Sequence, residues 1–225
     1  MKGTERRSYE MFVRVDNYME ARAANFPPES MAGQLRASLH AEIDIIEDKA
    51  AEQSMGLRMK EEGTALRGSA RENLNDQLEA IARTAVSIGR SGTAPGIETR
   101  FRMPQGNNDQ TLMNTARAFA ENALPIKGRF IIFGMPADFL DNLDSGITQV
   151  EQAINKQNSG KDMHVAATTA IDEAIERAMN IVRQLDAIIR NKYADDEPQL
   201  SAWKSARHIA RSPRRSTEEE EEPTP

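Results

Sequence analysis

Two apolar seams in a single register constrain the fold of this chain more than any other sequence feature. Each seam has four apolar residues spaced four, three and four positions apart, and the second repeats the first after five heptads. The seams are Leu39, Ile43, Ile46 and Ala50, and then Leu74, Leu78, Ile81 and Ala85. Apolar residues every 3.5 positions form a stripe along an α-helix that another helix must cover. No proline occurs between Pro28 and Pro95. The pattern predicts one α-helix over residues 30–91, with Ser30 as its N-cap.

The stretch between the two seams is polar and leaves two interpretations open. The same register holds Gln53, Leu57, Lys60, Thr64, Arg67 and Arg71, and Gly56, Gly63 and Gly68 fall in the same stretch. Each glycine costs a helix about 1 kcal/mol relative to alanine, so residues 56–68 could form a turn. However, no proline, asparagine or aspartate lies between Lys49 and Glu72. We therefore favour one continuous helix, whose glycine-containing middle is exposed and is the place where it bends.

Shorter helical segments surround the long helix. We expect helices at Thr4–Ala24 with Thr4 as N-cap, from Asn108 or Asp109 to Ala123, from Pro125 to Gly134, from Pro136 to Asn158, from Asp162 to Tyr193, and at Gln199–Ala210. We interpret Asn158-Ser159-Gly160 as a turn that makes a helical hairpin of the fifth and sixth segments. The run from Phe130 to Phe133 has strand propensity but no partner strand, so we interpret it as a buried helical turn.

These segments predict an all-α fold, an elongated antiparallel helical bundle built on the long helix. One domain would cover residues 1–211, and a disordered tail, basic and then acidic, would cover residues 212–225. The long helix exceeds its neighbours in length. Part of one seam, around Leu78 and Ile81, is therefore expected to lack a partner within the chain.

Composition excludes some classes of function. The net charge is −6, but Glu218–Glu222 supply five of these charges, so the body of the chain is nearly neutral. A neutral body gives no general electrostatic argument for binding nucleic acid or anionic membranes. Cysteine is absent, which excludes disulfides, thiolate metal sites and a cysteine nucleophile. The N-terminus lacks a signal-peptide pattern, and no stretch resembles a membrane span. We expect a cytoplasmic protein that does not contact a membrane.

The strongest candidate metal site uses one of the three histidines. His40 and Asp44 are four residues apart, with Glu47 on the next turn. Such a face can grip a metal ion, but it equally forms an ordinary solvated face opposite Leu39 and Ile43. Carboxylate-bridged di-iron bundles require Glu-x-x-His on two helices, and this motif is absent. We assign no metal ligand and no cofactor.

A second candidate is a partial phosphate-loop motif. Ser159-Gly160-Lys161-Asp162 resembles the end of Gly-x-x-x-x-Gly-Lys-Ser/Thr. The first glycine of the motif is missing, Asp162 replaces the hydroxyl residue, and no strand precedes the segment. A helix cap accounts for these residues, so we assign no nucleotide site.

A third candidate is a basic patch near the C-terminus. It comprises Lys204, Arg207, Arg211, Arg214 and Arg215, with Trp203 and His208 beside them. Basic residues next to an aromatic ring can hold phosphate and stack a base. The acidic run Glu218–Glu222 follows directly and would compete for these cations. A solvated helix end is the better interpretation, and nucleic acid is an unlikely partner.

Three segments resemble an uncharacterised family of bacterial all-helical proteins. They are MKGTERRSYEMF at residues 1–12, ARAFAENALPIK at 116–127 and GKDMH at 160–164. The resemblance implies a helical fold and supplies no activity, ligand or catalytic residue.

From these observations we predict a non-enzymatic structural or interaction protein that binds a partner protein or self-associates through coiled-coil-like seams. Two alternatives remain open: an enzyme or ligand binder that uses the 89–108 loop, and a nucleic-acid accessory protein that uses the 204–215 patch. The sequence assigns no catalytic residue, and it does not identify a substrate or partner.

Overall fold

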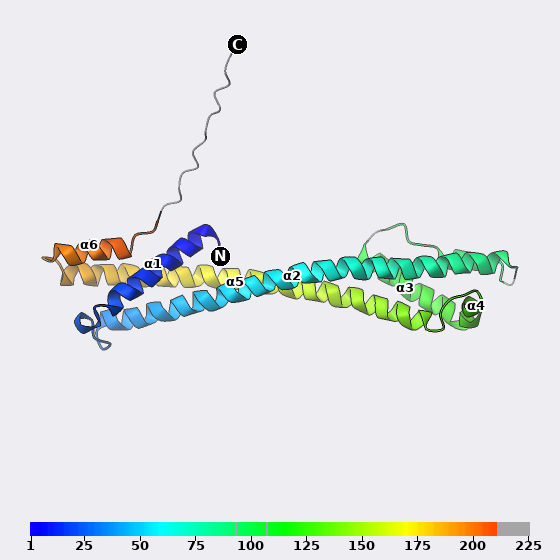
Figure 1. The fold of residues 1–225 in the computed structure, drawn as a ribbon, viewed down its shortest axis with the longest axis horizontal. Helices are drawn as coiled ribbons and strands as arrows, with labels where there is room; N and C mark the ends of the chain where they lie inside the picture. The colour runs from blue at the N-terminus through cyan, green and yellow to red at the C-terminus, as the bar shows by residue number, and fades with distance from the viewer. Residues whose placement is uncertain (93, 107, 211–225) are drawn as a thin grey trace, which may run out of the picture. The chain divides into compact units, whose positions relative to one another are not determined.

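The computed structural model describes residues 1–92, 94–106 and 108–210 and confirms the all-α prediction (Figure 1). Two long helices dominate, α2 (Met31–Arg90) and α5 (Phe139–Lys192). The shorter helices are α1 (Gly3–Glu20), α3 (Asp109–Ala123), α4 (Lys127–Ile132) and α6 (Glu197–Ala206), and 3-10 turns lie at Ala23–Asn25, Ile97–Phe101 and Leu124–Ile126. No strand occurs in these ranges. The tail predicted at residues 212–225 lies outside the described residues.

The prediction of one continuous long helix is confirmed. Helix α2 has 60 residues and passes through all three glycines without a break. The hydroxyl oxygen of Ser30 accepts a hydrogen bond from the Gly33 amide at 3.1 Å, as expected of an N-cap. The expectation of an uncovered seam is wrong, because Leu74, Leu78 and Ile81 are all fully buried. Other helices of the same chain cover the seams.

The predicted hairpin at Asn158–Gly160 is wrong. Helix α5 runs unbroken for 54 residues, so the segments expected on either side of that turn form one helix. The reason lies in the packing of Gly160 against α2. A β-carbon on Gly160 would lie 2.4 Å from the Lys60 amide nitrogen and 2.8 Å from the Gly56 carbonyl oxygen. Glycine here permits close approach of two helices and does not end one.

The same close approach corrects the expectation of an exposed glycine-rich middle. Gly56 and Gly63 are buried, and a β-carbon on either would meet the α5 backbone, at the His164 nitrogen (2.7 Å) or the Gln157 nitrogen (2.5 Å). Only Gly68 of the three is exposed with open space around it. The three glycines in the middle of α2 therefore fall into two kinds, two at a backbone-to-backbone crossing and one on the surface.

The chain divides into two compact units that share the long helices. Unit 1 is Met1–Gln53 with Ala166–Pro225, described up to residue 210, and unit 2 is Ser54–Val165. Each unit has its own apolar core. The single domain predicted over residues 1–211 stays a prediction, since both units draw on α2 and α5.

In unit 1, α1 and α6 pack on the first half of α2 and the last half of α5. The rings of Tyr18 and Trp203 contact each other with centroids 5.3 Å apart and planes tilted by 56°, and the Tyr18 hydroxyl donates to the Gln199 carbonyl oxygen. Tyr9 donates to the Glu47 carboxylate at 2.6 Å, and this hydrogen bond, with burial, raises the pKa of Tyr9. Aromatic residues of α1 therefore connect it to both α2 and α6.

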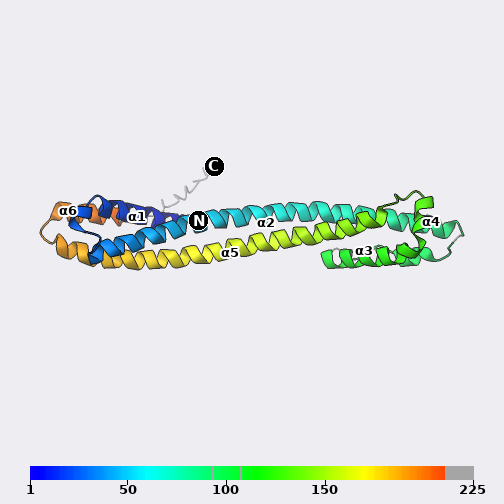
Figure 2. The same cartoon turned by 90° about the horizontal axis from the view of Figure 1, so that it is seen from below.

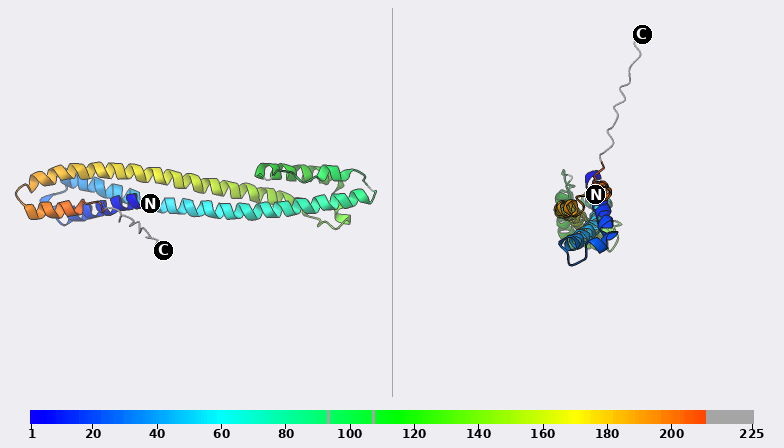
Figure 3. Two further views of the ribbon diagram at one scale, coloured as in Figure 1. Left: turned by 90° about the horizontal axis from the view of Figure 1, so that it is seen from above. Right: turned by 90° about the vertical axis from the view of Figure 1, so that its left-hand side faces the viewer.

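In unit 2, α3 runs alongside the second half of α2, as Figures 2 and 3 show. Leu112, Ala116, Phe119 and Ala123 lie on its buried face. Phe101 of the 89–108 loop contacts two rings, those of Phe119 and Phe130, each at a centroid distance of 5.2 Å. This aromatic cluster fixes the loop and α4 to the core.

Local signals place several helix ends differently from the prediction. Thr4 is not the N-cap of α1, because the helix begins at Gly3 and the Lys2 amide donates to the Glu5 carboxylate at 2.6 Å. Asn108 caps α3 as expected, accepting from the Thr111 amide. Pro136 lies in the turn before α5 rather than in its first turn, and α6 ends at Ala206.

Candidate functional site

The His40 candidate forms a contact that differs from the predicted one. Its Nδ1 atom lies 3.2 Å from Oδ2 of Asp16, a buried residue of α1 that also accepts from Arg36 at 3.1 Å. Glu47, expected beside it, instead accepts the Tyr9 hydroxyl. In the described part of the chain, no cluster of three or more histidine, aspartate or glutamate residues could hold a metal ion. His40 therefore helps to tie α1 to α2.

The partial phosphate-loop motif does not form a loop. Residues 159–162 lie in the interior of α5, where Gly160 faces the α2 backbone. A phosphate loop needs free backbone amides in a turn after a strand. Here those amides lie within a continuous helix, so the motif cannot cradle a phosphate in that way.

The predicted basic patch divides at the edge of the described residues. Arg211, Arg214 and Arg215 lie beyond them, while Lys204 pairs with Glu197 at 3.3 Å. Asp186 of α5 receives the Trp203 indole N–H at 2.7 Å, pairs with Arg190 at 3.0 Å and lies 3.3 Å from Arg207 Nε. The described part of the patch is therefore a structural joint between α6 and α5. It is not an open anion site.

Asp186 makes the stability of unit 1 depend on pH. Burial raises the pKa of this carboxyl, but hydrogen bonds from Trp203 and Arg190 and the charges of Arg207 and Arg190 outweigh it, so the pKa lies below its ordinary value of 3.8. A carboxyl whose pKa is lowered by folding stabilises the fold above the unfolded-state pKa and loses that effect as pH falls through the folded-state pKa.

We expect Asp186→Asn to lower the unfolding free energy by about 1 kcal/mol at neutral pH, because the charge-assisted hydrogen bonds become neutral ones. The difference in unfolding free energy between the variant and the native chain should shrink as the pH falls below the ordinary carboxyl pKa. Urea titrations followed by Trp203 fluorescence at neutral and acidic pH would measure both effects. Asp172→Asn, at an exposed position of α5, is the matched control and should change neither. If Asp186→Asn lowered the unfolding free energy as much at acidic pH as at neutral pH, the lowered pKa of Asp186 would be contradicted.

The 89–108 loop borders a cavity of about 350 Å³. Arg83, Glu98, Thr99 and Arg102 contribute its polar side chains. The Thr99 hydroxyl donates to the Gly96 carbonyl oxygen at 2.8 Å, so its proton is not directed to a general base. The cavity has charged walls, and the Thr99 hydroxyl that lines it is already paired with a backbone carbonyl.

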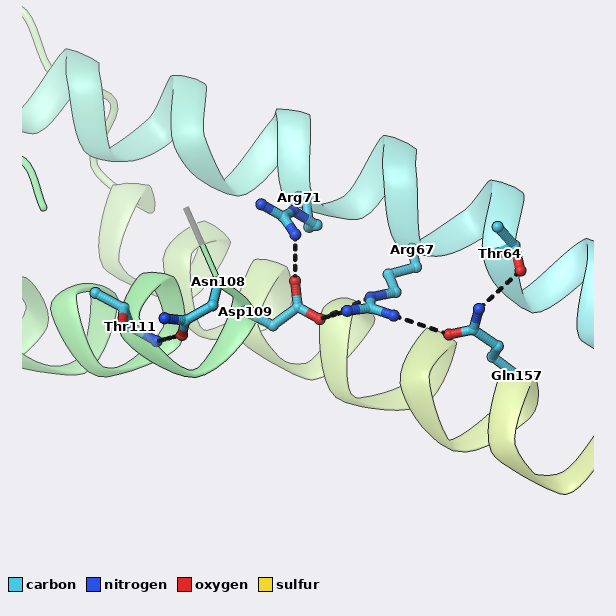
Figure 4. Close-up of polar contacts among 7 residues, drawn as sticks. All are labelled: Thr64, Arg67, Arg71, Asn108, Asp109, Thr111 and Gln157. Carbon is cyan, nitrogen blue, oxygen red and sulfur yellow. Dashed lines mark hydrogen bonds and ion pairs between the residues drawn. The ribbon is translucent and has the colours of Figure 1, made fainter. Parts of the chain in front are cut away.

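A polar network that the sequence did not reveal attaches α3 to both long helices (Figure 4). The buried carboxylate of Asp109 pairs with Arg67 at 2.6 Å and Arg71 at 2.7 Å, both on α2. Arg67 also donates to Gln157 of α5, whose amide donates to Thr64. Arg67 and Arg71 lie in the polar middle of α2, so nothing in the sequence distinguished them from solvated charges. The network positions α3 and leaves no open site.

A groove between α2 and α5 lies on the side of the pair that α3 does not cover. Two cavities of about 500 and 440 Å³ share Asn73 and Gln149 and together form what we call the α2–α5 groove. All of their lining residues come from α2, α5 and residues 135–136. Five carboxamide side chains line it: Asn73, Gln77, Asn142, Gln149 and Gln152. Asp76 and Lys156 are its charged residues, and Lys156 pairs with Glu62 at 2.5 Å.

The prediction that Phe130–Phe133 is a buried turn is half right. The segment is helical and Phe130 is fully buried, but Ile131 and Phe133 are each 39% exposed and Ile132 is 82% exposed. Leu124, one turn before α4, is 66% exposed. We call Leu124, Ile131, Ile132 and Phe133 the apolar corner. Exposed apolar side chains gathered in one place are typical of interaction surfaces.

Comparison with protein-family models, curated proteins and solved structures finds no match to this chain. The resemblance to uncharacterised bacterial helical proteins stays a prediction. Within the described ranges, no helix has the length and hydropathy needed to cross a membrane.

Proposed function

We propose that this protein acts by binding, as a helical interaction protein that self-associates through the α2–α5 groove of unit 2. The seams that first suggested association are covered within the chain, so this groove takes their place as the contact surface. One observation carries the proposal: the groove is open along two turns or more of both helices, and most of its polar lining side chains are carboxamides.

A carboxamide surface suits a second copy of the same chain. In a two-fold interface the same patch meets itself, so a charged patch would face its own charge. Asparagine and glutamine each carry both donors and an acceptor, so they can pair with a copy of themselves. Ala70, Ala80 and Ala153 keep the groove floor low enough for a helix to approach. A helix from a second chain that lies in the groove would pack against unit 2 as a further helix, beside α2, α3 and α5.

The displaced pKa values of unit 1 have structural causes. The pKa values of Tyr9, Tyr18 and Arg177 are raised and that of Asp186 is lowered. Catalytic groups commonly show such displacements inside a cleft. Here each has a structural cause, such as the hydrogen bond between Arg177 and Glu42.

Light scattering on the full chain should give twice the mass of one chain, falling toward one chain on dilution. The double variant Ser69→Glu/Gln149→Glu puts two exposed charges into the groove and should weaken association about tenfold or more, because each charge meets its own copy. Circular dichroism should stay unchanged, since both side chains are exposed.

Asn158→Glu adds the same charge on the opposite, exposed face of α5 and should leave the mass unchanged. A full chain that is monomeric at every concentration would refute self-association. So would a groove variant that keeps the native mass. A monomeric chain that binds a different protein in a manner sensitive to the groove variant would move the assignment to a partner protein.

A further inference from the structure

We propose that the end of unit 2 that carries the apolar corner binds the surface of an anionic lipid membrane. This inference is independent of the self-association proposed above. It concerns a different surface of unit 2 and depends on exposed apolar residues and unpaired basic residues that occur together there.

The apolar corner projects outward and lines none of the three cavities described above. Ile132 is the most exposed large apolar side chain in the described residues. β-Carbons on Gly128 and Gly134, which flank it, would meet no atom within 4 Å. An amphipathic peptide needs a concave apolar groove, whereas protruding apolar side chains can enter the acyl boundary of a bilayer. The shape of this corner therefore favours a lipid surface.

The charge of the surrounding segment has the sign that an anionic surface attracts. Residues 83–134 contain seven arginines and lysines against three acidic residues, a net charge of +4 in a chain whose total is −6. Of the three acidic residues, Asp109 is buried and already paired with Arg67 and Arg71. The nearly neutral total of the chain body conceals this local excess.

Most of these basic side chains are not neutralised within the protein. Arg83, Arg90, Arg100, Arg102 and Lys127 form no ion pair with any other residue that the structure describes. Basic residues close to an anionic leaflet are attracted to it within a Debye length.

Ring contacts place part of this charge beside the apolar corner. The Phe101 ring contacts the Phe130 ring of α4, so Arg100 and Arg102 lie next to a residue that touches α4. Lys127 is in α4 itself. Figures 1 and 2 show α4 beside the last turns of α2, where Arg83 and Arg90 lie. Apolar and basic groups thus share one end of unit 2, the combination that binds peripheral proteins to lipid.

Sedimentation with vesicles tests the inference on the full chain. We expect binding to vesicles of equal parts phosphatidylcholine and phosphatidylserine, and little binding to phosphatidylcholine alone. High salt should weaken the binding. Ile132→Asp/Phe133→Asp, which removes insertion, and Arg100→Glu/Arg102→Glu, which removes attraction, should each lower the partition coefficient by about tenfold or more. Met55→Asp, an exposed apolar position elsewhere on unit 2, should have no effect.

The absence of cysteine allows a direct measurement of insertion. An environment-sensitive dye on Ile132→Cys should shift to the blue with anionic vesicles, and the same dye on Met55→Cys should not. No binding by the folded chain, equal binding to both vesicle types, or no shift at residue 132 would each overturn the proposal. A shift with a soluble acidic protein but not with vesicles would also overturn it, and would point to a protein partner.

Discussion

Replacing Leu78 by glutamate should unfold unit 2 rather than separate two associated chains. Leu78 is fully buried in the core that α2 shares with α3 and α5, together with Leu74 and Ile81. Truncating such a leucine alone costs about 2–5 kcal/mol, and burying a carboxylate adds a desolvation penalty. We expect the unfolding free energy to fall by about 4 kcal/mol or more, a large share of the stability of a typical domain.

Urea titrations followed by circular dichroism would measure this loss, with Leu57→Glu as the matched control. Leu57 lies on the same helix and is 41% exposed, so its replacement should change the unfolding free energy by less than about 0.5 kcal/mol. A Leu78→Glu chain that keeps its native midpoint would show that the seam is not covered as described. A chain that stays folded but loses association would restore the seam as the interface.

Adding a single methyl group at Gly160 should destabilise unit 2, whereas the same change at Gly68 should stabilise it. In an isolated helix both changes to alanine would gain up to about 1 kcal/mol. At Gly160 the new β-carbon would lie 2.4 Å from the Lys60 amide nitrogen, and backbone cannot move aside unless the two helices separate. We expect a net loss of about 1–3 kcal/mol for Gly160→Ala, the usual range for overpacking.

Gly68→Ala adds the same atom where nothing lies within 4 Å, so the helix propensity term alone should remain. Differential scanning calorimetry of the two variants would give opposite changes in melting temperature. Two changes of the same sign would mean that Gly160 does not lie at a close crossing. Gly63→Ala, next to the Gln157 backbone, should follow Gly160.

Sequence patterns alone could not predict the apolar corner and the basic segment around it. The exposure of Ile132 depends on which neighbours cover α4, and an apolar run of four residues carries no periodicity that separates a buried side chain from an exposed one. The basic excess of residues 83–134 was present in the sequence and becomes visible when charge is summed by segment.

The sequence by itself determined those features that depend on local chemistry and on helical period. The heptad spacing around Leu39 and Leu74 predicted the length and continuity of α2, and Ser30 and Asn108 cap α2 and α3 as expected. These features require only neighbours within one or two turns, so a single segment contains all the information.

Only the tertiary structure decided the meaning of residues that act across the fold. Gly160 looks like a helix terminator in its own segment, and it becomes a contact point only because α2 brings Gly56 and Lys60 against it. Arg67 and Arg71 look like solvated charges until Asp109, some forty residues later, is placed between them. A local pattern specifies what a residue can do, and the packing of distant helices selects which of those properties the protein uses.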